Sequence, residues 1–169
     1  MARHYVYRLD HDTGFAPHVG HRMCTVCGCK IGTIEKWAQP ESWVIGIGGN
    51  GTGKPDALIY TMRVESTPRY ADFLRRYPRE SAYLRMYMID PVAPVLLSTH
   101  FYYFGDNAVQ IPRSLKRIII RRQGCKRVDD DDVALLETFL AQRYYVGVHG
   151  RPNNKRNDTQ SSHPCTRKC

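Results

Sequence analysis

The chain has 169 residues, a mass of 19.5 kDa and 42% hydrophobic residues, which suits one compact domain and leaves little room for a second. Its longest apolar runs are far shorter than the ~20 residues that cross a bilayer. The N-terminus also lacks the pattern of a secretory leader. We therefore expect a cytoplasmic protein with no membrane partner.

The formal net charge of +9 is unevenly distributed along the chain. Residues 1–60 carry 6 Lys and Arg against 5 Asp and Glu, residues 61–128 carry 13 against 5, and residues 129–169 carry 6 against 6. A concentrated basic surface suits polyanions, nucleic acid first and acidic membrane surfaces second. The alternative is a soluble protein that merely happens to be basic.

The sequence patterns, taken in chain order, alternate between strand and helix signals. We expect strands at 3–9, 43–47 and 57–64, and a β-rich stretch at 92–104. We expect helices at 34–38, from a Ser66 or Thr67 cap to 77, and from 133 to about 145 behind an Asp129–Asp132 cap. Residues 115–120 fit either a strand or one face of a helix, and residues 18–28 show neither period.

These elements predict an α+β domain over residues 1–150. Its sheet is expected to be small, mixed, mainly antiparallel and barrel-like, with two or three flanking helices. Residues 151–169 are rich in polar and basic residues, so we expect a disordered basic tail.

The glycine-rich segment Gly46–Lys54 resembles a phosphate-binding loop only in part. Pro55 stands where the P-loop requires Ser or Thr, so the hydroxyl that would bind magnesium is missing and no helix can begin there. We interpret the segment as a hairpin turn, and a backbone-amide pocket for another anion stays open as an alternative.

The six cysteines are expected to be reduced thiols, because the chain carries no export signal. His18, His21, Cys24, Cys27 and Cys29 are metal-competent, but a structural zinc site needs a second distant pair of ligands. Only the two cysteines of the tail are available for that. We expect no metal and no cofactor, and both buried free thiols and a functional thiol remain open.

Four residues are candidates for catalysis. Asp12 lies where the first strand ends in a loop, a common place for a general base, although turn chemistry explains it equally well. Cys24 or Cys29 is the candidate nucleophile, with Lys30 favouring the thiolate and stabilising negative charge.

Aromatic and glycine positions supply candidates for ligand binding. Tyrosine and tryptophan rings stack on bases where they face a groove, and core packing is the alternative. The candidates for ligand binding are Phe15, Trp43, Gly46, Gly48, Tyr60 and Tyr103. The candidates for phosphate binding are Arg63, Arg75, Arg76, Arg121 and Arg122.

Several phrases occur in order between about residues 5 and 152. They are Gly14–Pro17, Cys24–Thr25, Cys29–Lys30, Trp43–Gly48, Leu58–Val64, Phe101–Gly105 and the closing Gly147, Gly150 and Pro152. Together they resemble the second family of nucleotide-modification-associated domains. The hairpin is also similar to the barrel strands of the PUA-like group, which includes the EVE and ASCH domains. The family resemblance implies association with modified nucleotides in DNA or RNA and supplies no settled reaction.

We therefore expect a base or nucleotide to bind in a pocket formed by segments 12–17, 24–30 and 43–48. The first alternative is an enzyme that modifies a base or nucleotide at an Asp/Cys/Lys site. A further alternative is a basic protein-interaction accessory module. The sequence leaves open whether the ligand is a free nucleotide, DNA or RNA. It also leaves the oligomeric state open.

Overall fold

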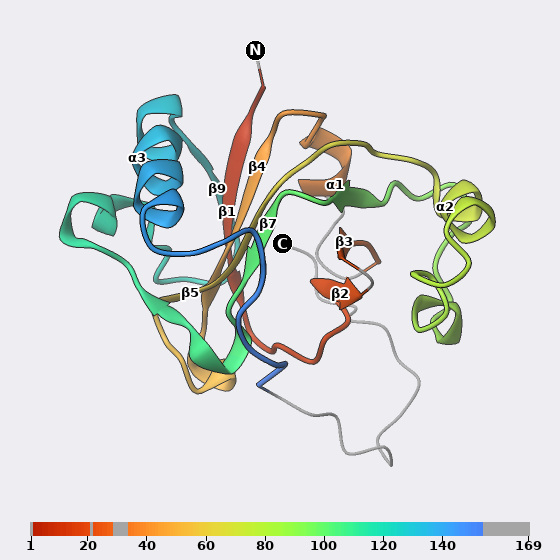
Figure 1. Cartoon of the computed structure of the whole chain (residues 1–169), viewed down its shortest axis with the longest axis horizontal. Coiled ribbons are helices and arrows are strands. Elements are labelled where there is room, and N and C mark those ends of the chain that lie inside the picture. Colours follow the sequence, from red (N-terminus) through yellow and green to blue (C-terminus); the bar gives the residue numbers. More distant parts are fainter. Residues whose placement is uncertain (1, 21, 29–33, 154–169) are drawn as a thin grey trace.

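The computed structural model describes residues 2–20, 22–28 and 34–153, which form two sheets and three α-helices (Figure 1). The larger sheet comprises β1 (His4–Leu9), β4 (Trp43–Gly48), β5 (Ala57–Arg63), β7 (Phe101–Tyr103), β8 (Val109–Gln110), β9 (Cys125–Val128) and β10 (Gly147–Val148). The smaller sheet comprises β2 (His18–Gly20), β3 (Met23–Val26) and β6 (Leu96–Ser98). The α-helices are α1 (Ile34–Trp37), α2 (Tyr70–Arg76) and α3 (Asp130–Ala141), and the 3-10 helices are η1 (Asn50–Thr52), η2 (Leu84–Met86), η3 (Gly105–Asn107) and η4 (Arg113–Ile118).

The larger sheet has the strand order β10-β7-β5-β4-β1-β9, with β8 pairing with β5. The β1–β4 and β7–β10 pairs are parallel, and all the other strand pairs of both sheets are antiparallel. The prediction of an α+β domain with a mixed, mainly antiparallel sheet and flanking helices is confirmed. Within the described residues this sheet stays open between β10 and β9, so the term barrel-like applies only loosely.

The two faces of the larger sheet bury separate cores because side chains alternate along each strand. Trp43, Ile45 and Ile47 of β4 face α3 and η4, together with the apolar residues of those helices. Val44 packs in the other core, beside side chains of β1, β3 and α1. Figure 1 shows α3 on one side of the sheet and α1, β2 and β3 on the other. A third core lies around α2 and η2.

The hairpin and the acidic helix cap are found where the sequence predicts them. β4 and β5 pair antiparallel around the glycine-rich turn. Asp129 is the N-cap residue of α3, with three further carboxylates in the first turn. The helix ends at Ala141, about one turn before the predicted end, and η4 covers most of the ambiguous segment 115–120.

The predicted cap of α2 is wrong, and two further segments differ in detail from their sequence patterns. The cap of α2 is Arg69, because Ser66 pairs with Leu97 in a β-bridge and holds the preceding chain extended. The β-rich stretch 92–104 contains two short strands, β6 and β7, which belong to different sheets. Residues 18–28 contain β2 and β3, two short strands that no period marks.

Candidate functional site

Three tyrosines form a transverse row on one face of the larger sheet, and we call it the tyrosine row. In the strand register, Tyr7 of β1 pairs with Gly46 of β4, Gly46 pairs with Tyr60 of β5, and Tyr60 pairs with Tyr103 of β7. The hydroxyl oxygens of Tyr7 and Tyr60 are 2.7 Å apart and hydrogen-bonded. All three rings are buried, so they present hydroxyl groups within the core rather than open faces for stacking.

Gly46 leaves the space that lets the Tyr60 ring lie across β4. A Cβ at this position would lie 2.5 Å from the Cδ1 atom of Tyr60 and 2.5 Å from the Cδ1 atom of Leu9. The register between β4 and β5 also shifts beyond Gly46, where Ile47 pairs with Leu58, so Ile59 is an extra residue in β5. A bulge of this kind redirects side chains next to it, and here Ile59 and Tyr60 both join the same core.

Asp12 lies at one end of the tyrosine row and is 1% exposed. The Tyr103 hydroxyl donates to its two carboxylate oxygens at 3.0 and 2.9 Å. The backbone N–H groups of Gly14 and Asn153 donate to the same carboxylate. Burial raises the pKa of Asp12 above its ordinary value of 3.8, and these hydrogen bonds oppose the shift. A buried carboxylate held by three donors is a strong and directional acceptor.

Cys24 lies in the same core, with its Sγ atom 3.8 Å from the Sδ atom of Met62. Burial raises the pKa of this thiol. Burial also raises the pKa of Tyr103, and the Asp12 carboxylate adds to that shift through its charge and its hydrogen bond. Both groups are therefore neutral near pH 7. The environment of Cys24 opposes a thiolate, which a nucleophilic cysteine requires.

His18 fixes the loop that carries Asp12. Its Nδ1 atom donates to the carbonyl oxygen of Gly14 at 2.9 Å, and its ring stacks on Tyr83 at 4.8 Å between centroids. Burial lowers the pKa of His18. Phe15 of the same loop packs against Tyr87 at 4.0 Å. These two contacts attach the loop to the core around α2 and η2.

The structure brings Asp12, Cys24, Gly46, Tyr60 and Tyr103 together on one face of the larger sheet. Phe15 is buried in the neighbouring core around α2 and η2. Trp43 lies on the opposite face, three strand positions from Gly46. The two-residue period of a strand predicts this, because residues an odd number of positions apart point to opposite faces. Gly48 allows the hairpin backbone to approach Lys54 closely. Cys29 and Lys30 lie outside the described residues.

The candidate phosphate ligands occupy separate surfaces. Arg75 and Arg76 lie on α2, where Arg75 pairs with Asp72 and Arg76 lies over the Tyr77 ring. Arg121 and Arg122 are exposed in the loop before β9. Figure 1 shows α2 at one end of the long axis and β9 with α3 toward the other. Arg63, at the end of β5, forms an ion pair with Glu41.

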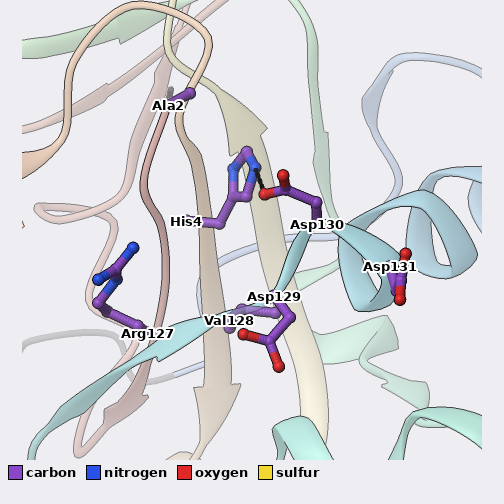
Figure 2. Close-up of a pocket in the computed structure, with 7 residues that line it drawn as sticks. All are labelled: Ala2, His4, Arg127, Val128, Asp129, Asp130 and Asp131. Atoms are coloured by element: carbon purple, nitrogen blue, oxygen red, sulfur yellow. Dashed lines mark ion pairs between the residues drawn. The ribbon is translucent and has the colours of Figure 1, made fainter.

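A pocket of about 340 Å³ lies at the far end of β1 from Asp12. It is lined by Ala2, His4, Arg127, Val128, Asp129, Asp130 and Asp131 (Figure 2). The Nδ1 atom of His4 accepts a hydrogen bond from the Trp43 backbone at 2.9 Å, and its Nε2 atom lies 3.2 Å from a carboxylate oxygen of Asp130. The histidine therefore joins β1, β4 and α3. The pocket contains part of the acidic cap of α3 but none of the residues predicted for catalysis, ligand binding or phosphate binding.

Residues 2–20, 22–28 and 34–153 contain no group of three His, Cys, Asp or Glu side chains placed to hold a metal ion. The same residues contain no helix with the length and apolar character needed to span a bilayer.

These features define an α+β domain with an open mixed sheet and a buried carboxylate beside a row of tyrosines. The family model described as nucleotide modification associated domain 2 matches residues 1–86 and 87–159, and the chain belongs to this family. The resemblance seen in the ordered phrases is therefore confirmed. No curated protein and no solved structure matches the chain. The likeness to the PUA-like group stays a prediction.

Proposed function

We propose that this domain binds a base or a nucleotide at the Asp12 end of the tyrosine row. The observation that supports the proposal is the buried carboxylate of Asp12, held in place by the Tyr103 hydroxyl. A desolvated acceptor of this kind selects for ligands that present N–H donors, because an unpaired buried carboxylate is costly. Carboxylates recognise the amino edges of bases in this way.

The pocket is expected to be bounded by segments 12–17, 24–30 and 43–48. Phosphate groups of the ligand would be held by Arg121 and Arg122 on one side or by Arg75 and Arg76 on the other. The two arginine pairs lie toward opposite ends of the molecule, so a single mononucleotide is expected to use one pair and a polynucleotide can use both.

The test is calorimetric titration of the full chain with the four common ribonucleoside monophosphates. We expect at least one of them to bind, and Asp12→Asn to weaken that binding at least about tenfold, equivalent to ~1.4 kcal/mol. The matched control is Asp131→Asn, which makes the same chemical change at an exposed residue of α3. Absence of binding to the wild type, or equal affinities of the Asp12→Asn variant and the wild type, would overturn the proposal.

A second candidate function is catalysis on a bound base or nucleotide. The observation that favours it is the raised pKa of Asp12, because a carboxyl group with a raised pKa is a better general base near neutral pH. In this version Asp12 is the base and Cys24 is a packing residue, while Cys29 and Lys30 remain candidate groups. Mass spectrometry of nucleotides and oligonucleotides incubated with the wild type and with Asp12→Asn tests it, since a product formed only by the wild type is required.

A further inference from the structure

Residues 149–153 run over the end of the tyrosine row, and we call them the strap. The strap continues from β10, the strand that pairs with β7. The backbone N–H of His149 donates to the carbonyl oxygen of Tyr103 at 2.7 Å, and the side-chain amide of Asn107 donates to the carbonyl oxygen of His149 at 2.7 Å. The strap therefore begins directly above the tyrosine that holds Asp12.

Asp106 clamps the middle of the strap with two hydrogen bonds. Its backbone N–H donates to the carbonyl oxygen of Arg151 at 2.8 Å, and its carboxylate accepts the backbone N–H of Arg151 at 2.8 Å. Glycines at 105 and 150 allow this close approach, because a Cβ at either position would collide with the facing backbone. One of the two hydrogen bonds uses the Asp106 carboxylate, and a single substitution can remove it while the backbone hydrogen bond stays.

The end of the strap covers Asp12. The backbone N–H of Asn153 donates to the Asp12 carboxylate, and the side-chain amide of Asn153 donates to the carbonyl oxygen of Thr52. Pro152 lies 2.9 Å from the point where a Cβ on Gly14 would stand. Because Asp12 is 1% exposed, a ligand that pairs with its carboxylate from this side must displace the end of the strap.

We propose that the backbone N–H of Asn153 occupies the place of a ligand amino group, and that the strap exchanges with nucleotides whose base carries an exocyclic amino group. This inference rests on the proposed function and adds to it the class of ligand and the way in which the ligand enters. The strap keeps the buried carboxylate paired while the site is empty.

The chemistry of the carboxylate determines the class of base. An ionised carboxylate only accepts hydrogen bonds, so the group that replaces Asn153 must be a donor. The amino group of cytosine offers such donors. The ring N–H of uracil is also a donor, but the carbonyl oxygens on both sides of it would face the carboxylate and repel it. Cytidine and uridine monophosphates therefore form a matched pair of probes.

A strap that must open lowers the apparent affinity of the site by the fraction of molecules in which it is open. Loosening the clamp raises that fraction and so tightens the binding of a ligand that uses Asp12. A residue that merely supported the fold would give the opposite result, because its loss would weaken the site.

The experiment measures the affinities of cytidine and uridine monophosphates for full-length variants of Asp106. We expect Asp106→Ala to bind cytidine monophosphate at least about threefold more tightly than the wild type, with no gain for uridine monophosphate. Asp106→Asn keeps an acceptor for the Arg151 N–H and should behave like the wild type. Asp131→Ala is the control for a change of charge at a distant exposed site.

A second pair of variants keeps the test decisive if Asp106→Ala folds poorly. Asn153→Pro removes the N–H that donates to Asp12, whereas Asn153→Ala keeps it and removes only the side-chain amide. We expect the proline variant, and to a smaller degree the alanine variant, to bind cytidine monophosphate more tightly than the wild type. Amide hydrogen exchange of residues 149–153 should rise in Asp106→Ala and should also rise in the wild type when cytidine monophosphate binds.

Equal effects on both nucleotides, weaker binding by Asp106→Ala, or equal results for Asp106→Ala and Asp106→Asn would overturn the inference. Failure of the proposed function gives a different result from failure of this inference. In that case neither nucleotide binds to any variant, although hydrogen exchange still shows that the strap has opened in Asp106→Ala.

Discussion

The hydroxyl group of Tyr103 donates to both carboxylate oxygens of Asp12, at 3.0 and 2.9 Å, across a separation of 91 residues in the sequence. This pair joins the end of β7 to the loop that follows β1. It also explains how a carboxylate can be buried beside the core, since its charge is shared among hydrogen-bond donors from three parts of the chain.

Removing the Tyr103 hydroxyl should destabilise the fold. Tyr103→Phe leaves the buried carboxylate short of one donor, so the free energy of unfolding should fall by about 1–3 kcal/mol. Chemical denaturation checks this value. Tyr145→Phe is the control, because Tyr145 is exposed and its hydroxyl makes only a 3.4 Å contact with Val148; its effect should stay within about 0.5 kcal/mol. Equal losses for the two variants would contradict the role given to Tyr103.

The stability of the protein should depend on pH through Asp12. Its pKa in the folded state is raised above the ordinary value of 3.8. At pH values between the unfolded and the folded pKa, the folded protein therefore retains a proton that the unfolded chain has released. Stability from this group is therefore complete below the unfolded pKa and is lost as the pH rises through the folded pKa.

The measurement is urea denaturation of the wild type and Asp12→Asn at a series of pH values. The free energy of unfolding of the wild type relative to the variant should decrease as the pH rises above 3.8 and should then level off. A difference that increases with pH would show that the hydrogen bonds to the carboxylate outweigh its burial.

Gly46→Ala should disrupt the tyrosine row. The added methyl group would lie within 2.5 Å of side-chain carbons of both Tyr60 and Leu9, two buried residues that pack against β4. We expect a loss of about 1–3 kcal/mol, typical of overpacking, together with changed chemical shifts of Tyr7 and Tyr60. Gly20→Ala is the matched control, because the nearest atom there is 3.5 Å away. A Gly46→Ala protein as stable as this control would contradict the packing described.

Cys24 should resist alkylation in the folded protein. It is fully buried and burial raises the pKa of its thiol, whereas Cys125 is partly exposed. Treatment with iodoacetamide at pH 7.5, followed by peptide mass spectrometry, should show modification of Cys125 before Cys24. In denaturant the two rates should become similar. Preferential labelling of Cys24 in the native state would restore the nucleophile interpretation.

The two arginine pairs should contribute independently to the binding of a polynucleotide. If nucleic acid contacts them, Arg121→Ala/Arg122→Ala and Arg75→Ala/Arg76→Ala should each reduce the slope of log affinity against log salt by about 1–2. Fluorescence anisotropy with a 30-nucleotide single strand measures these slopes. Arg63→Ala is a comparison, because Arg63 is a single arginine at the end of β5, outside both pairs. Slopes that do not change in either double variant would exclude phosphate contacts at these residues.

The sequence by itself determined the features that depend on neighbouring residues. The strand β1 follows from its alternating residues, the β4–β5 hairpin follows from two apolar runs around a glycine-rich turn, and the start of α3 follows from its acidic cap. The ordered phrases identified the family. Asp12 and Cys24 were singled out because of their positions in loops and short motifs, although nothing local indicated that both are buried.

Only the tertiary structure decided which distant groups meet. The tyrosine row depends on the registers of β1, β4, β5 and β7, and the register between strands far apart in sequence is set by the packing of whole faces. The same packing places Trp43 in the opposite core and separates the two arginine pairs. The strap reaches Asp12 because β10 pairs with β7, and this non-local contact gives Asn153 its place over the carboxylate.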